Sequence, residues 1–136
     1  MYPFAYCNRR PTGAFTLVEL MMVIGIIVLL ASIAVPAYER VRLRSQAARI
    51  MQDLRIIDSA LDQYATDYNK SSGALVAFVD LQPYIKTGSS LYLSGADLFG
   101  VPYGPFSVDF LPQVSPSTYN ALSDVTTPGF WSPYGP

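Results

Sequence analysis

Histidine is absent from this 136-residue sequence, and cysteine occurs once, as Cys7. The absence of histidine removes the commonest general base and the commonest metal ligand of proteins, which argues against an enzyme. A single cysteine cannot form a disulfide within the chain, so packing alone must hold the folded part together. Charged residues make up only 14% of the sequence, and the net charge is −1. Because nucleic-acid binding normally requires a basic face, no nucleic-acid partner is expected.

Charge is also missing from a long apolar segment near the N-terminus. The eighteen residues from Leu20 to Ala37 carry no charge, which is the length at which a segment is interpreted as a membrane-spanning helix. Arginines stand on both sides of the segment, so their distribution does not decide its orientation. Glu19 lies at its start, and an acidic side chain in hydrocarbon costs on the order of 2.5 to 3.5 kcal/mol. The acid therefore needs a partner or a function.

Two simple interpretations of this segment stay open. It could be a plain membrane anchor, or a secretory signal peptide cut near Ala31 to Ala34. The second is disfavoured because the apolar run is longer than the 7 to 15 residues typical of signal peptides and because Glu19 interrupts its beginning. Arg9 and Arg10 suggest twin-arginine export, but the sequence after them lacks the bulky apolar residue of that signal.

The segment GAFTLVELMMVIGIIVLLASIAVPA, residues 13–37, resembles the N-terminus of type IV pilins and type II secretion pseudopilins. In that family a basic leader ends at a small residue and is followed by phenylalanine, by glutamate four residues later and by proline twenty-one residues after the phenylalanine. Phe15, Glu19 and Pro36 have this spacing. Leaders of the family usually end in glycine, whereas here Ala14 follows Gly13. We expect cleavage between Ala14 and Phe15, which keeps the register, with cleavage after Gly13 as the alternative.

The resemblance implies roles for Phe15, Glu19 and Pro36. Prepilin peptidase would remove the leader and methylate the new amine of Phe15. We hypothesise that Glu19 pairs with the Phe15 amine of a neighbouring subunit; the alternative is that Glu19 reaches lipid headgroups and has no specific partner. Pro36 lacks an N–H and clashes with the preceding turn, so it bends or opens one helix, or separates two helices. Gly25 adds a second weak point.

An amphipathic helix is expected after the apolar segment, because residues 39–68 contain no glycine or proline. Its apolar residues recur at steps of three and four, which predicts one apolar stripe packed against a small head. Arg49 and Asp53 have the spacing of an i, i+4 ion pair. A helix from Phe15 to Tyr68 would reach about 80 Å. The stripe consists of Leu43, Ala47, Ile50, Leu54, Ile57, Leu61, Tyr64 and Tyr68.

Turns are expected to dominate after Gly73, where glycine and proline are frequent. Residues 106–110 alternate between apolar and polar and so predict a strand, with residues 91–93 as its partner. Asp80 is expected to cap a brief helical turn through Tyr84, and Ser115 with Pro116 to begin a short helix that runs to Ser123. The aromatic residues Phe130, Trp131 and Tyr134 are expected to cover the core of the head.

The stretch DLFGVPYG, residues 97–104, resembles an element of the major pseudopilins. Gly100 permits a positive φ, Pro102 stiffens the turn and Asp97 is able to cap nearby backbone N–H groups. Major pseudopilins often bind calcium in a C-terminal loop. After Asp80, however, the only acids here are Asp97, Asp109 and Asp124, which lack the clustering that calcium prefers. We expect no cofactor, with a calcium site on these three residues as the alternative.

These observations predict an α+β fold of the type IV pilin kind in four segments: a cleaved leader (1–14), a transmembrane and filament-core helix (15–38), an amphipathic stem helix (39–70) and a small head of short antiparallel strands and turns (71–136). The expected function is structural. The chain would sit in the bacterial inner membrane with its head in the periplasm and form a helical homo-oligomeric filament through an inner-membrane assembly platform. A type II secretion pseudopilin is the first choice; a type IV pilin and a monomeric membrane-anchored binding domain are the alternatives.

Overall fold

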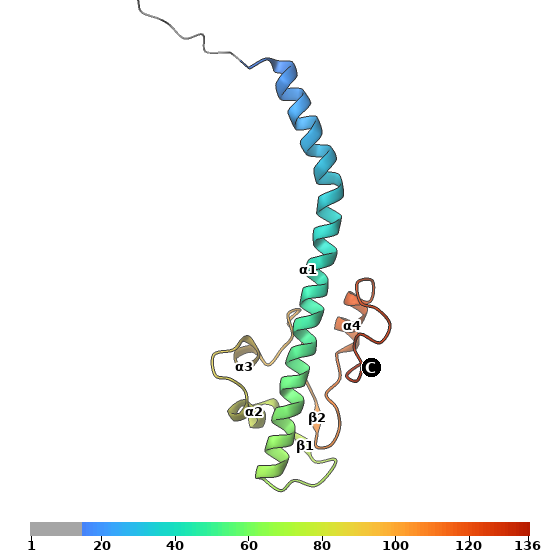
Figure 1. Ribbon diagram of the computed structural model, residues 1–136. Helices are drawn as coiled ribbons and strands as arrows, with labels where there is room; N and C mark the ends of the chain where they lie inside the picture. Colours follow the sequence, from blue (N-terminus) through green and yellow to red (C-terminus); the bar gives the residue numbers. More distant parts are fainter. Residues whose placement is uncertain (1–14) are drawn as a thin grey trace, which may run out of the picture. The chain divides into compact units, whose positions relative to one another are not determined.

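The computed structural model describes residues 15–136 (Figure 1), so the leader assigned to residues 1–14, with Gly13 and Ala14, lies outside the described part. The expected α+β fold is confirmed as one long N-terminal helix and a small C-terminal region with a pair of antiparallel strands. The elements are α1 (Leu17–Asp67), β1 (Leu75–Val76), α2 (Phe78–Leu81), a 3-10 turn (Gln82–Tyr84), α3 (Ser90–Ser94), β2 (Phe106–Ser107) and α4 (Pro116–Leu122).

Helix α1 is unbroken over 51 residues and continues through Gly25 and Pro36. An arrangement in which one helix ends before Pro36 and another begins after it does not occur. By its contacts the chain divides into two units, one up to Ala37 and one from Tyr38 to Pro136.

The described residues of the first unit, 15–37, are all exposed. In the described part of the chain, this end of α1 is the one stretch of helix long and apolar enough to cross a membrane, with a mean hydropathy of 2.7 over its best window.

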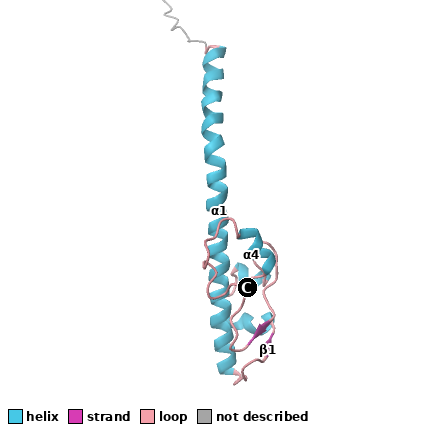
Figure 2. Ribbon diagram, turned by 90° about the vertical axis from the view of Figure 1, so that its right-hand side faces the viewer, coloured by secondary structure: helices cyan, strands magenta, loops and turns pink. Residues whose placement is uncertain are grey.

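In the second unit, the rest of α1 forms one side of the core. The predicted stripe is buried from Ala47 to Leu61, whereas Tyr68 lies beyond the last residue of α1 and is exposed. Met51 and Ala60 are buried as well, so the apolar face is wider than the predicted stripe. Figure 1 shows α2 and α3 on one side of this half of α1 and α4 on the other, and Figure 2 shows α4 and β1 beside it.

Two groups of head residues pack on this face. One joins Ala47 to Leu54 with the C-terminal part of the head, including the three aromatic residues Phe130, Trp131 and Tyr134, as expected. The other joins Ile57 to Leu61 with the two strands and α3. Together they form one core along a single helix face.

The strand pairing differs from the prediction. β2 covers only the first two of residues 106–110 because Asp109 adopts a positive φ of 65° and turns the chain. Its partner is β1, with Leu75 opposite Ser107 and Val76 opposite Phe106. The expectation for residues 91–93 is wrong, because they lie in α3, which begins where the Ser89 hydroxyl accepts a hydrogen bond from the Tyr92 N–H at 3.1 Å.

Of the two predicted helix starts, the one at Pro116 is confirmed and the one at Asp80 is misplaced. α4 begins at Pro116 after Ser115, as predicted, and ends one residue early at Leu122, but the Ser115 side chain makes no capping hydrogen bond. Asp80 lies inside α2 instead of preceding it, and its carboxylate accepts a hydrogen bond from the Ala77 N–H at 3.3 Å. Asp80 therefore stabilises the start of α2 from the helix's first turn.

Candidate assembly site

The first turn of α1 brings Thr16 and Glu19 together. The Thr16 hydroxyl accepts a hydrogen bond from the Glu19 N–H at 3.2 Å, and Glu19 Oε2 accepts from the Thr16 N–H at 3.0 Å and from its hydroxyl at 2.9 Å. This reciprocal arrangement is a capping box, which satisfies backbone donors that a helix start otherwise leaves unpaired. Glu19 therefore has a partner within its own chain.

The sequence analysis missed the role of Thr16, although the signal was present. Threonine followed three residues later by glutamate and then by an apolar run is the usual pattern of a capping box. All three hydrogen bonds involve one carboxylate oxygen or the backbone of Glu19, so Oε1 keeps its capacity to accept. Phe15 directly precedes the box and its side chain is 81% exposed. The carboxylate of Glu19 thus lies in the first turn of α1, and the predicted new N-terminus, Phe15, directly precedes the capping residue Thr16.

Pro36 lies within α1 and is exposed, like the residues around it. Gly25 is likewise exposed, and a Cβ added there would meet no atom within 4 Å. Both positions are on a surface that no other described residue covers. Their predicted contribution to assembly stays a prediction.

In the head, Asp97 organises the element that residues 97–104 form. Its Oδ1 accepts hydrogen bonds from the N–H groups of Phe99 at 2.8 Å and Val101 at 2.9 Å, and its Oδ2 accepts from the Thr118 hydroxyl. Gly100 has the positive φ that was expected, 79°. The carboxylate is 8% exposed, so it holds this loop to α4 from the inside.

The calcium alternative gains no geometric support from these residues. Asp97 uses both oxygens internally, while Asp109 and Asp124 are exposed. Within residues 15–136, no three acidic, cysteine or histidine side chains come together as metal ligands would. The structure therefore does not bring the three predicted ligands to one point.

Three tyrosines fasten the head to the acidic side chains of α1. Their hydroxyls donate to carboxylates, in the pairs Tyr103 with Asp53 at 3.4 Å, Tyr134 with Asp58 at 3.1 Å and Tyr84 with Asp67 at 2.7 Å. The bond to Asp67 raises the pKa of Tyr84 to about 12. Burial raises the pKa of Asp53, although the nearby Arg49 guanidinium and the Tyr103 bond oppose that shift.

The predicted ion pair between Arg49 and Asp53 is not formed. Arg49 donates instead to the Ser90 hydroxyl at 2.9 Å, and Asp53 accepts from Tyr103. Tertiary partners outcompete an exposed i, i+4 pair, which contributes only a few tenths of a kcal/mol.

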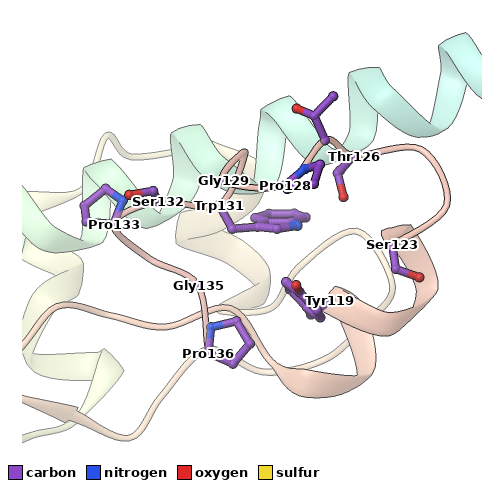
Figure 3. Close-up of a pocket in the computed structure, with 11 residues that line it drawn as sticks. Tyr119, Ser123, Thr126, Pro128, Gly129, Trp131, Ser132, Pro133, Gly135 and Pro136 are labelled. Atoms are coloured by element: carbon purple, nitrogen blue, oxygen red, sulfur yellow. The ribbon is translucent and has the colours of Figure 1, made fainter.

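The C-terminal part of the head surrounds a hollow of about 550 Å³ (Figure 3). Its lining consists of hydroxyl side chains, prolines, glycines and the rings of Tyr119 and Trp131, whose centroids are 6.4 Å apart. Trp131 Nε1 is buried and has no hydrogen-bond partner among residues 15–136. None of the side chains that line the hollow carries a charge at neutral pH.

The N-terminal part of the chain is similar to known proteins. Residues 9–35 match the family described as prokaryotic N-terminal methylation motif. The chain is 36% identical over 64 residues to the type IV major fimbrial protein FimA of Dichelobacter nodosus, a match that covers 47% of this chain and 40% of that relative. It is 48% identical over 48 residues to fimbrial protein Q of Moraxella bovis, covering 35% of this chain and 31% of the relative.

A longer match extends into the head. The chain is 27% identical over 118 residues to type II secretion system core protein G of Klebsiella michiganensis, which covers 85% of this chain and 82% of that relative. By contrast, the matched part spans only about two fifths of the FimA length. No solved structure matches the chain. The N-terminal segment of this chain is therefore similar to a prokaryotic N-terminal methylation motif, and the chain is similar to type IV fimbrial proteins and to a core protein of type II secretion.

Proposed function

We propose that this chain is a structural subunit of a helical fibre, without catalytic activity. The observation that carries the proposal is that the apolar N-terminal part of α1 is fully exposed and begins with a capped turn that contains the acidic residue Glu19. Residues 17–35 expose large apolar side chains along their whole length, and a contiguous apolar surface of that kind is covered by lipid or by another protein. A subunit that moves from membrane to fibre uses the same surface in both places.

The capping box supports a specific role for the acid. We propose that peptidase cleavage between Ala14 and Phe15, followed by methylation, places an amine beside Glu19, and that Glu19 pairs with this amine on a neighbouring copy. The capping bonds occupy Oε2, so Oε1 is available to a cation. An acid in apolar surroundings gains most from such a partner, because leaving it unpaired there is costly.

Among the two fibre types, we propose the pseudopilin of a type II secretion machine, which would drive protein export. The similarity to core protein G runs through the head, whereas the FimA and fimbrial protein Q matches cover 47% and 35% of the chain. The Asp97 loop, whose sequence resembles the major pseudopilins, is a built element held by three hydrogen bonds. A type IV pilin of a surface pilus is the second candidate, favoured by the fimbrial relatives.

The proposed location is the inner membrane, with residues 38–136 in the periplasm before assembly. The proposed partners are prepilin peptidase, an inner-membrane assembly platform and further copies of the chain. Both fibre candidates share these partners, so the test below addresses the fibre itself.

Two substitutions of Glu19 separate its charge from its capping role. Glutamine is accepted at this position of a capping box, so Glu19→Gln keeps the helix start but removes the negative charge. Glu19→Ala removes both. The measurement is fibre yield, by electron microscopy and sedimentation, in cells that supply the peptidase and platform.

We expect both variants to be cleaved and inserted normally and to lose most fibre. Full assembly of Glu19→Gln would show that only capping matters and would contradict the pairing. Absence of fibre from the unaltered, correctly trimmed chain would contradict the proposed function as a whole.

A further inference from the structure

The charged residues of α1 outside the apolar run are separated by sign. The basic segment, residues 39–49, carries four arginines and one glutamate, a net charge of +3. The acidic segment, residues 53–67, carries four aspartates and one arginine, a net charge of −3. The residues are Glu39, Arg40, Arg42, Arg44 and Arg49 in the first and Asp53, Arg55, Asp58, Asp62 and Asp67 in the second.

Helix stability does not account for this order. Acidic residues near a helix C-terminus face the negative end of the helix dipole, which is unfavourable, and α1 has no basic residue in its last turn. No arginine or lysine in residues 15–136 lies within 4.0 Å of a carboxylate oxygen. Two segments of opposite and equal net charge therefore share one helix, and among residues 15–136 their charged groups form no close ion pair.

Tyrosine hydroxyls hold two aspartate side chains of the acidic segment in place. Tyr134 and Tyr84 each donate to Oδ2 of an aspartate, Asp58 and Asp67 respectively, which leaves the second oxygen of each able to accept. Asp62 is exposed, and within residues 15–136 no hydrogen bond to its carboxylate is found. Fixed carboxylates lose less conformational entropy when an arginine binds them.

Two arginines and two aspartates lie on opposite flanks of the helix, although each flank also carries charges of the other sign. Arg40 and Arg44 project on the side of Asp58 and Asp62, and Asp53 and Asp67 project on the side of Arg42 and Arg49. At about 100° per residue, Arg42 and Arg49 project close to one direction, and Asp58 and Asp62 project roughly opposite to it. Arg42 and Arg49 are exposed, as is Asp62, and Asp58 is half-buried. A second helix that lies parallel, alongside and displaced along the axis would therefore bring its Asp58 and Asp62 to the flank of the first helix that carries Arg42 and Arg49.

We propose that the basic segment of one copy docks against the acidic segment of a second, parallel copy, displaced along the helix by about 15 residues or about 22 Å. Arg42 then lies level with Asp58 of the second copy and Arg49 with its Asp62, because these separations are 16 and 13 residues. The contact joins two different flanks, so it is heterologous and repeats without closing, which generates a fibre. This inference rests on the proposed function and specifies one of its contacts.

Anionic lipid headgroups are the competing partner for the arginines. The basic segment follows the apolar run directly, and such segments are attracted to acidic membranes. Lipid, however, does not account for the exposed charge of the acidic segment, such as Asp62. A second copy uses both segments, and their charges are equal and opposite, which favours it.

Charge reversal tests the contact. Arg49→Asp and Asp62→Arg each place like charges together between copies, and we expect each to lower fibre yield by about tenfold. The combined variant restores an opposite pair at every contact, so we expect it to recover to within about twofold of the parent. Lys86→Glu, an exposed reversal outside α1, is the matched control and should leave the yield unchanged.

Disulfide cross-linking gives an independent readout. Cys7 precedes Phe15, so a chain cut there has no native cysteine. Arg49→Cys combined with Asp62→Cys places two thiols 13 residues apart on α1, about 20 Å, which is too far for a bond within one chain. We expect oxidised fibres to give a ladder of dimers, trimers and longer species, whereas Arg49→Cys alone gives nothing beyond dimers.

The outcomes separate the inference from the proposed function. If the parent chain forms no fibre, the proposed function fails. If fibres form but the reversals leave their yield unchanged and no ladder appears, the contact is wrong. Loss of binding to vesicles containing phosphatidylglycerol in Arg42→Glu and Arg49→Asp, with unchanged fibre yield, would assign the basic segment to lipid and overturn the proposal.

Discussion

Removal of the Asp97 carboxylate is expected to destabilise the head strongly. Asp97 is almost fully buried and accepts hydrogen bonds from two backbone N–H groups and from the Thr118 hydroxyl. In Asp97→Ala these three donors lose their acceptor. Asp97→Asn keeps one oxygen in the place of Oδ1, and its NH₂ group is able to donate to the Thr118 hydroxyl oxygen instead.

The size of the effect follows from the number of bonds. A hydrogen bond to a charged group contributes about 1.5 to 3 kcal/mol, and bonds that share one acceptor do not add fully, so the alanine variant should lose about 4 kcal/mol. The asparagine variant exchanges charged for neutral hydrogen bonds and should lose about 1 to 2 kcal/mol. For a unit of about 100 residues, each kcal/mol corresponds to about 4 to 8 °C in Tm.

Thermal unfolding of the full chain in detergent measures this. Trp131 is the only tryptophan and lies in the core of the head, so its fluorescence reports on the head alone. Asp124→Ala, which removes an exposed acid, is the control. A loss below about 1 kcal/mol in Asp97→Ala would refute the assignment of Asp97 as the residue that holds the loop to α4.

Three further changes test the packing and the charges of the head in the same unfolding measurement. Leu54→Ala should cost about 2 to 5 kcal/mol because the side chain is fully buried, whereas Ile56→Ala, on the exposed side of α1, should cost well under half of that; equal losses would contradict the orientation of α1. Gly95→Ala should destabilise by at least about 1 kcal/mol, because Gly95 has φ 59° and a Cβ there would lie 2.9 Å from Phe78 Cδ1; an unchanged Tm would contradict this geometry. Asp53 has a raised pKa in the folded head because of burial, so its contribution to stability falls as pH rises from the ordinary value of 3.8 through the folded value; Asp53→Asn should remove that fall in the pH range above 3.8, and an unchanged pH profile would contradict the raised pKa.

The long helix was predictable because its signal is repeated over many turns. An eighteen-residue uncharged run and a regular apolar stripe each specify a helix by themselves, and both lie in α1. The turn at Gly100 and the capping by Asp97 were predictable for another reason. Glycine adopts a positive φ without strain, and an aspartate side chain commonly accepts a hydrogen bond from the backbone two residues later.

Short elements of the head were not predictable from pattern. Two-residue strands contain too few positions for alternation to be recognised, which is why β1 at Leu75 and Val76 was missed. Residues 91–93 are too few to distinguish a strand from a helix, and the Ser89 cap, a local hydrogen bond, favours the helix. Arg49 and Asp53 have the spacing of an ion pair, but their partners Ser90 and Tyr103 come from distant parts of the chain.

The candidate site was predictable in its residues more than in its geometry. Phe15, Glu19 and Pro36 followed from the resemblance of their spacing to the N-terminus of type IV pilins and pseudopilins. The hydrogen bonds between Thr16 and Glu19 could be identified only from the structure. They show that Oε2 of Glu19 is bound to Thr16 of the same chain, which leaves Oε1 for another partner.

The mass of the mature N-terminus is the most direct test of the account. The full chain is expressed with a prepilin peptidase, isolated from membranes and examined by intact-mass and N-terminal fragment mass spectrometry. We predict a chain that begins at Phe15 and carries one added methyl group on its amine. A chain that still begins at Met1, or one cut near Ala34, would contradict it.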